Sequence, residues 1–150
     1  MDKTPEYCQS DHMVLFLVIG SSLRSNGFDQ AAAGMTFVAD VKTKACYHLY
    51  SLDDKYAALI PVAEGDSTGV SVSGELVVIS EAKLERIRAS EPDGIVPGCV
   101  ILDDGREVVG ALGDIVVMRS KAIDITSFGS FAKYKASLTK LPEPSARSKL

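Results

Sequence analysis

The chain has 150 residues, the length of one ordinary domain, and its 46% hydrophobic and 24% charged residues are close to the globular average. That composition excludes a disordered or fibrous chain. The 16 Lys and Arg residues against 20 Asp and Glu residues give a net charge of −4, with no basic stripe to neutralise phosphates. We therefore expect no nucleic-acid partner and no membrane partner, which leaves small molecules and proteins.

Cysteine and histidine usage argues against a metal and for a reducing compartment. The three cysteines are odd in number and have no short spacing: Cys8, Cys46 and Cys99. This pattern indicates neither a disulfide framework nor a structural zinc site, so we expect a cytoplasmic protein without a metal. A phosphate-binding glycine loop and a dinucleotide fingerprint are also missing, so we expect no cofactor. A catalytic histidine would have to be His48, for which a sheet-face imidazole is the favoured interpretation.

In the first half of the chain, residues 1–12 are predicted to be a disordered tail before a single domain over 13–138. The apolar run over 14–19 is typical of a strand buried on both faces, and it is too short to cross a membrane, which takes about 20 residues. Residues 35–41 and 45–50 are predicted to be strands or a hairpin. Pro61 favours an edge strand or a bulge over 57–62.

The second half opens with an extended segment over 70–78, predicted to be a half-buried strand with Gly74 as a bulge. Its alternation divides the side chains between two faces: Val70, Val72, Leu76 and Val78 on the apolar one, and Ser71, Ser73 and Glu75 on the polar one. Ser80 is a predicted N-cap for a helix over 81–90.

The remaining elements complete the expected fold. Asp-Gly at 104–105 predicts a tight hairpin between strands over 99–102 and 106–112. A short strand over 115–118, a last helix from Thr126 and a second disordered tail over 139–150 follow. Strands outnumber helices without regular alternation, so we expect an α+β fold, a small mixed β-barrel with flanking helices.

One candidate binding segment follows the first strand. Ile19, Gly20, Ser21, Ser22 and Leu23 leave a buried strand and enter a polar loop. Consecutive unpaired amides and hydroxyls in such a loop can surround an anion or a developing oxyanion. The alternative is an ordinary polar turn, and at this point both interpretations stay open.

Two carboxylates are the candidate proton-transfer groups. Glu91 lies at the end of the predicted helix, where partial desolvation and the helix dipole would both raise the pKa of its carboxyl group. Its alternative is a solvated helix-terminal carboxylate. Glu75, on the polar side of its strand, either faces a cavity or lies at its rim.

These segments resemble the gamma-glutamylcyclotransferase-like superfamily. Gly20-Ser21-Ser22-Leu23 looks like the superfamily's loop, Gly74-Glu75-Leu76 looks like its Gly-Glu-Leu strand, and Glu91 occupies the place of its catalytic Glu. More closely, the chain resembles the C-terminal domain of allophanate hydrolase over about residues 14 to 136. The segments that carry this resemblance are 34–38, 47–50, 102–106, 109–110 and 124–131.

Three positions depart from the patterns of these families. Ile19 stands where the cyclotransferase loop has Tyr, and Pro92 stands where Gly follows the acidic residue. Ser22 stands where the allophanate hydrolase loop carries His, so the chain lacks the imidazole that would exchange protons near neutral pH. The resemblance also implies a homodimer, and an amidase as a partner.

Three functions follow as hypotheses. The resemblance implies decarboxylation of N-carboxycarbamate, a small carboxylated carbamate of nitrogen metabolism, with the amides of 20–23 holding a carboxylate and Glu91 or Glu75 moving the proton. The second is cyclotransfer, in which Glu91 deprotonates a substrate amine that attacks its own gamma-carbonyl and releases 5-oxoproline. The third is a non-catalytic ligand-binding or assembly module.

Overall fold

The computed structural model describes residues 12–63 and 65–140. Most of the two predicted tails lies outside these residues. Of the expected N-terminal tail, His12 is described, and its carbonyl accepts a hydrogen bond from Glu81 N (3.1 Å). Of the expected C-terminal tail, residues 139 and 140 are described and belong to the last helix.

The chain forms eight strands, three α-helices and two 3₁₀ turns within the described residues. In chain order they are β1 (Met13–Val18), η1 (Arg24–Asn26), β2 (Thr36–Lys42), β3 (Tyr47–Leu52), β4 (Tyr56–Pro61), β5 (Ser73–Ser80), α2 (Glu81–Ser90), β6 (Ile95–Ile101), β7 (Glu107–Gly113), α3 (Ile115–Lys121), β8 (Ile123–Asp124), η2 (Thr126–Phe128) and α4 (Phe131–Lys140).

All eight strands belong to one mixed sheet. Its order is β2-β5-β1-β7-β4-β3-β8, and β6 pairs with β7 beside this path. β1 runs antiparallel to β5 and parallel to β7, which is also parallel to β4. A bridge between Thr43 and Leu102 joins the end of β2 to the β6–β7 hairpin, so that β2, β5, β1, β7 and β6 close into a small barrel. The expected α+β fold with a mixed barrel is therefore confirmed.

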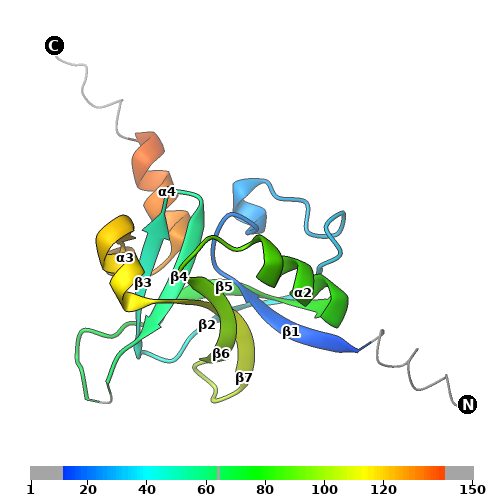
Figure 1. Ribbon diagram of the computed structural model, residues 1–150, viewed down its shortest axis with the longest axis horizontal. Helices are drawn as coiled ribbons and strands as arrows, with labels where there is room; N and C mark the ends of the chain where they lie inside the picture. The colour runs from blue at the N-terminus through cyan, green and yellow to red at the C-terminus, as the bar shows by residue number, and fades with distance from the viewer. Residues whose placement is uncertain (1–11, 64, 141–150) are drawn as a thin grey trace, which may run out of the picture.

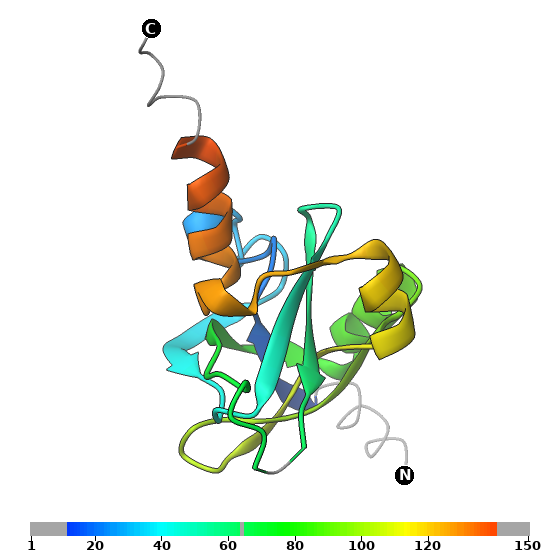
Figure 2. The same cartoon turned by 90° about the vertical axis from the view of Figure 1, so that its left-hand side faces the viewer.

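The helices flank this sheet on different sides. In Figure 1, α2 lies against β5 and β1, whereas α3 and α4 lie at the far end beside β3 and β4. Figure 2 shows α4 rising past the β3–β4 hairpin. The core between these elements is mostly aliphatic with some aromatic side chains, and its fully buried members include Leu17, Leu49, Leu59, Leu76 and Phe131.

Three predicted elements are confirmed in detail. β1 matches the apolar run, and its last residues are buried. The β6–β7 hairpin turns at Gly105, whose φ of 91° requires the freedom of glycine. Helix α2 begins after Ser80, whose Oγ accepts a hydrogen bond from Lys83 N at 3.0 Å.

Other predicted elements are wrong. The run 115–118 is not a strand but the start of α3, which is capped by Asp114 Oδ1 through the amides of Val116 (2.9 Å) and Val117 (3.1 Å). β4 is not an edge strand, because it lies between β7 and β3. Pro61 is tolerated because it is the last residue of that strand. The two segments predicted as strands or a hairpin are strands, β2 and β3, but they do not form a hairpin, since β2 pairs with β5.

The pattern of β5 differs from the predicted half-buried strand. Both faces are covered, because buried side chains occur on each of them: Glu75, Val77 and Ile79 on one face and Leu76 on the other. The bulge lies on β2, between Phe37 and Ala39, and not at Gly74. Gly74 has another reason to be glycine: a Cβ there would lie 2.7 Å from Val18 O.

Among the described helices, none has the length and apolar character that a membrane span requires.

Candidate functional site

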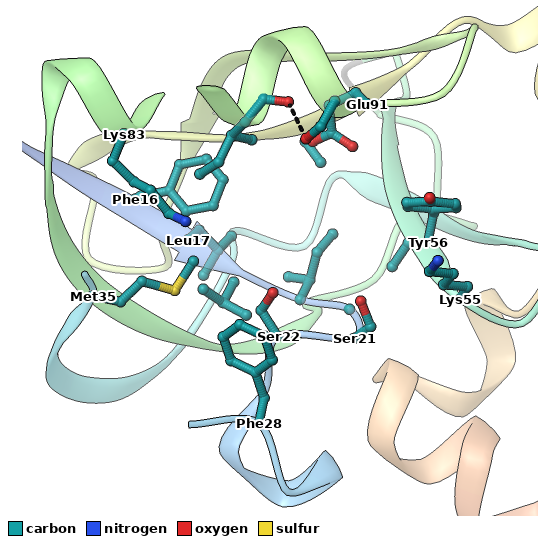
Figure 3. A pocket seen from close by; sticks show the side chains of 17 residues that line it. Phe16, Leu17, Ser21, Ser22, Phe28, Met35, Lys55, Tyr56, Lys83 and Glu91 are labelled. Atoms are coloured by element: carbon teal, nitrogen blue, oxygen red, sulfur yellow. Dashed lines mark hydrogen bonds between the residues drawn. The ribbon is translucent and has the colours of Figure 1, made fainter. Parts of the chain in front are cut away.

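A pocket of about 230 Å³ opens where β1 ends, between α2 and the β3–β4 hairpin. Figure 3 shows it with the loop after β1 below, α2 above and the hairpin to the right. Its lining comes from five parts of the chain: Phe16, Leu17, Val18, Ile19, Gly20, Ser21 and Ser22; Phe28 and Met35; Lys55, Tyr56 and Ala57; Lys83, Ile87, Ser90 and Glu91; and Ala111 on β7.

The predicted binding loop forms one wall of this pocket. Ile19, Gly20, Ser21 and Ser22 line it, whereas Leu23 is buried and does not. The loop turns sharply, because Leu23 N donates to Gly20 O at 3.1 Å. Within the described part of the chain, the amides of Ser21 and Ser22 donate to no protein acceptor. The loop therefore offers free N–H groups and two hydroxyls to a ligand.

Gly20 is required by the close approach of β4. A Cβ at this position would lie 3.1 Å from Ala57 N and 3.2 Å from Ala57 Cβ. Both contacts are tighter than ordinary packing, so a side chain would push the loop away from the hairpin. Glycine at position 20 therefore allows the loop and β4 to lie in contact where both line the pocket.

Glu91 lies on the opposite wall from the loop. It is the residue after the last turn of α2, with extended backbone, and it lines the pocket. Burial raises the pKa of the Glu91 carboxyl group above its ordinary value. Among residues 12–63 and 65–140, the Glu91 carboxylate has no hydrogen-bond or ion-pair partner. The dashed line beside it in Figure 3 is a different hydrogen bond, which Ser90 Oγ donates to Ile87 O (3.1 Å). An unpaired, partly desolvated acid facing free amides is suited to proton transfer.

Two lysines complete the pocket, and the sequence interpretation missed both. Lys83 comes from α2 and Lys55 from the β3–β4 turn, so they approach from different sides (Figure 3). For Lys83 a signal existed: it precedes Ile87 by four residues, which places both on one side of the helix that ends just before Glu91. For Lys55 there was none, because its place depends on the long-range pairing of β4 with β7.

The structure does not bring Glu75 into this pocket. Its carboxylate is buried beneath the loop, where Oε1 accepts from Gln30 Nε2 (2.8 Å) and Arg24 N (3.0 Å). Arg24 Nε lies 3.2 Å from Glu75 Oε2. Gln30 Nε2 also donates to Ser22 O at 3.0 Å. Glu75 is thus neither a cavity-facing nor a rim residue, and it supports the loop from behind.

His48 also lies away from the pocket. Its Nε2 is 2.8 Å from Thr68 Oγ1, and Thr68 donates to Asp66 Oδ1 at 2.5 Å. This exposed cluster ties the loop after β4 to the surface of β3. No three His, Cys, Asp or Glu side chains gather as a metal-binding group in the part of the chain described by the structure.

The arrangement can bind a small anion and transfer a proton to or from it. Positive charge comes from the two lysines, hydrogen bonds come from the loop amides, and the acid is held apart from other charged partners. The volume is below the range of about 300–1,000 Å³ that drug-sized ligands occupy. The fold and the site therefore define a small α+β barrel protein whose pocket is lined, among the described residues, by two lysines, a loop with free amides and one unpaired glutamate.

The family can now be stated. The model of the allophanate hydrolase C-terminal domain matches residues 14–136, and the chain belongs to this family. Among solved structures, the chain is similar to a uropathogenic E. coli-specific protein, with 32% identity and a TM-score of 0.72, over 83% of this chain and 97% of that one. No match was found among curated proteins.

Two further structures share the fold at lower identity. Allophanate hydrolase from Kluyveromyces lactis is 23% identical with a TM-score of 0.71, over 85% of this chain and 22% of that one. An uncharacterized protein from Pyrococcus horikoshii is 18% identical with a TM-score of 0.59, over 85% of this chain and 98% of that one. The chain thus corresponds to about a fifth of the yeast enzyme and to nearly the whole of the other two proteins.

Proposed function

We propose that this chain decarboxylates a small N-carboxylated carbamate or amide, of which N-carboxycarbamate is the simplest example. The observation that carries the proposal is the shared pocket of Glu91 and the Gly20 loop, with Lys55 and Lys83 in the same lining. The family membership supports the substrate class, since the matched domain belongs to allophanate hydrolase.

Charge and size favour a compact dianion. N-carboxycarbamate carries one carboxylate on each side of a nitrogen. Two lysine ammonium groups supply two positive charges, and the amides of Ser21 and Ser22 supply hydrogen bonds to carboxylate oxygens. The pocket volume of about 230 Å³, below the range for drug-sized ligands, supports a compact ligand.

The proton balance assigns Glu91 the role of general acid. The bond between nitrogen and one carboxylate carbon breaks, its electron pair stays on nitrogen, and CO₂ leaves. Nitrogen takes the proton of the Glu91 carboxyl group, which yields carbamate, and the ionised Glu91 is reprotonated from water. Because burial raises the pKa of Glu91, more of the acid form is present near neutral pH than for an exposed glutamate. Glu75, already held by Arg24 and Gln30, has no part in this step.

The test uses a substrate that a second enzyme generates in the reaction mixture. An amidase that cleaves allophanate releases ammonia and N-carboxycarbamate from ¹³C-labelled allophanate, and ¹³C NMR follows the conversion of the latter to carbamate and CO₂. We expect wild-type protein to accelerate this step and Glu91→Gln to lose the acceleration. Equal rates with and without wild-type protein would overturn the proposal.

Cyclotransfer remains the second candidate, because the same Glu91 facing the same loop could act as a base toward a substrate amine. A parallel incubation with gamma-glutamyl amino acids, read by proton NMR for 5-oxoproline, separates the two. Release of 5-oxoproline that Glu91→Gln abolishes would replace decarboxylation by cyclotransfer. Saturable binding without either turnover would instead indicate the ligand-binding module.

A further inference from the structure

The turn that carries Lys55 into the pocket has an unusual backbone. Residues 53–55 connect β3 to β4, and both Asp53 (φ 59°) and Asp54 (φ 54°) have the left-handed conformation although neither is glycine. Such residues cost free energy unless their surroundings hold them. Lys55 N donates to Leu52 O at 3.1 Å and closes the turn.

Helix α4 holds this turn from outside the pocket. Tyr134 Oη donates to Asp54 Oδ1 at 2.6 Å, and Lys135 Nζ donates to Asp54 O at 2.9 Å. One residue of the turn therefore receives two hydrogen bonds from consecutive residues of a helix that does not itself line the pocket. The two elements are far apart in the sequence, and Figure 2 shows them rising together at the same side of the molecule.

Capping and packing hold helix α4, and with it the donors of the two hydrogen bonds to Asp54, in a fixed position. Ser130 Oγ accepts from Lys133 N at 3.0 Å and caps its first turn. Phe131 is fully buried, and the Tyr134 ring, itself buried, packs edge-on against Phe128 at a centroid distance of 5.4 Å. The hydroxyl of Tyr134 is thus held at a fixed point, and the position of Asp54 follows from it.

Lys55 comes directly after the anchored residue. Its ammonium lies 5.3 Å from the ring centroid of Tyr56, and both residues line the pocket on the side of Ser21 (Figure 3). Lys55 is exposed and has no carboxylate partner among the described residues. The place of its charge therefore depends on the backbone of the turn and on the Tyr56 ring.

We propose that Tyr134 is a positioning residue of the pocket: through Asp54 it fixes the β3–β4 turn so that Lys55 faces the ligand, and it thereby sets the affinity for anions. This inference deepens the proposed function, because it concerns the anion site on which that function rests. The ligand class is a small dicarboxylate or its carbamate equivalent.

Malonate is a suitable probe, because it has two carboxylates on one central atom and does not decompose. NMR titration with malonate gives the dissociation constants of wild type, Tyr134→Phe, Lys55→Met and the double variant. Tyr134→Phe keeps the packed ring and removes one hydrogen bond. We expect it to weaken binding about two- to threefold and Lys55→Met about fivefold, the loss of one screened ion pair. The double variant should match Lys55→Met alone.

Two variants of Asp54 serve as matched controls. Asp54→Asn tolerates the left-handed backbone and still accepts from Tyr134, so we expect wild-type affinity. Asp54→Gly accepts the same backbone but loses the acceptor, so we expect the affinity of Tyr134→Phe. In the enzymatic assay, Tyr134→Phe should raise KM and leave kcat unchanged.

Each other outcome has a defined meaning. If Tyr134→Phe lowers only the melting temperature, or weakens malonate binding equally with and without Lys55, the tyrosine is structural and this inference is wrong. If wild type does not bind malonate at all, the anion site itself is refuted, and the proposed decarboxylation falls with it.

Discussion

The carboxylates of Glu91 and Glu75 differ in their location and in their hydrogen-bond and ion-pair partners. Glu75 lies on a central strand beneath the loop and has a cation and an amide as partners. Glu91 lies on the pocket wall after α2 and has no such partner among the described residues. Both were candidates for proton transfer on the basis of the sequence.

This difference leads us to expect different roles for the two carboxylates. A buried carboxylate whose oxygens are occupied by donors fixes its neighbours in place. A partly buried carboxylate without donors has its acid form favoured and is free to give up a proton to a ligand. The four predictions below test this division of roles, from the largest expected effect to the smallest.

Replacement of Glu91 should affect turnover and not folding. Glu91→Gln keeps the shape of the side chain and removes the transferable proton, so we expect the decarboxylation rate to fall about 10²- to 10⁴-fold. Glu85→Gln, an exposed position on the same helix, is the control and should keep the wild-type rate. A Glu91→Gln variant with full activity would end the distinction between the two carboxylates.

Replacement of Glu75 should lower the stability of the folded protein. Glu75→Ala leaves Arg24 and Gln30 without their acceptor and creates a hole beneath the loop, so we expect the free energy of unfolding to drop by about 2–3 kcal/mol. Arg24 is half exposed and can regain water, which keeps the loss below that of a fully buried pair. Urea denaturation measures the difference. Glu85→Ala, which removes an exposed pair with Arg88, should change it by less than about 0.5 kcal/mol.

The packing around Glu75 offers a milder test. Gly74→Ala places a Cβ 2.7 Å from Val18 O and 2.9 Å from Leu17 Cδ1, so β5 and β1 must move apart. We expect a loss of about 1–3 kcal/mol, measured by thermal denaturation. Ser73→Ala on the same strand is the control. Equal stability of both variants would mean that this part of the sheet is looser than its packing indicates.

The smallest expected effect is a change with pH in the difference between the free energies of unfolding of wild type and Glu91→Gln. The pKa of Glu91 is raised in the folded protein, so the unfolded chain loses this proton first and wild type is destabilised as pH rises above about 4.5, the ordinary glutamate value. Glu91→Gln cannot lose a proton. Its stability relative to wild type should therefore increase between about pH 4 and pH 7, as urea denaturation at both values would show. A constant difference would contradict the raised pKa.

Local signals in the sequence were sufficient for part of the fold. Ser80 as an N-cap and Asp-Gly at 104–105 predicted α2 and the β6–β7 hairpin, because caps and tight turns depend on neighbouring residues alone. For α3 the local signals conflicted: a short apolar run is compatible with a strand or a helix, and Asp114 was the cap that decided for the helix. β4 was placed at an edge because Pro61 was given more weight than its position at the end of the strand.

The sequence could predict only those site residues whose type and immediate neighbours already suggest binding or proton transfer. Of the residues predicted for the site, Glu91 and 19–22 line the pocket and Leu23 does not, and their roles stay predictions. Lys55 and Tyr56 reach the pocket through strand pairings that no local pattern encodes. Glu75 was misjudged as facing a cavity or a rim because alternation was taken to mean one solvated face. In β5, side chains on both faces are buried, so the strand has no solvated face at Glu75.

The parallel pairing of β7 with both β1 and β4 has a consequence for the order of folding. The β6–β7 hairpin involves neighbouring segments and can form early, but Phe16 pairs with Val109, and these residues come from opposite halves of the chain. Closing so long a loop is slow. The pocket walls from β1 and β4 can meet only after both have docked on β7, so ligand binding should be among the last properties that a refolding chain regains.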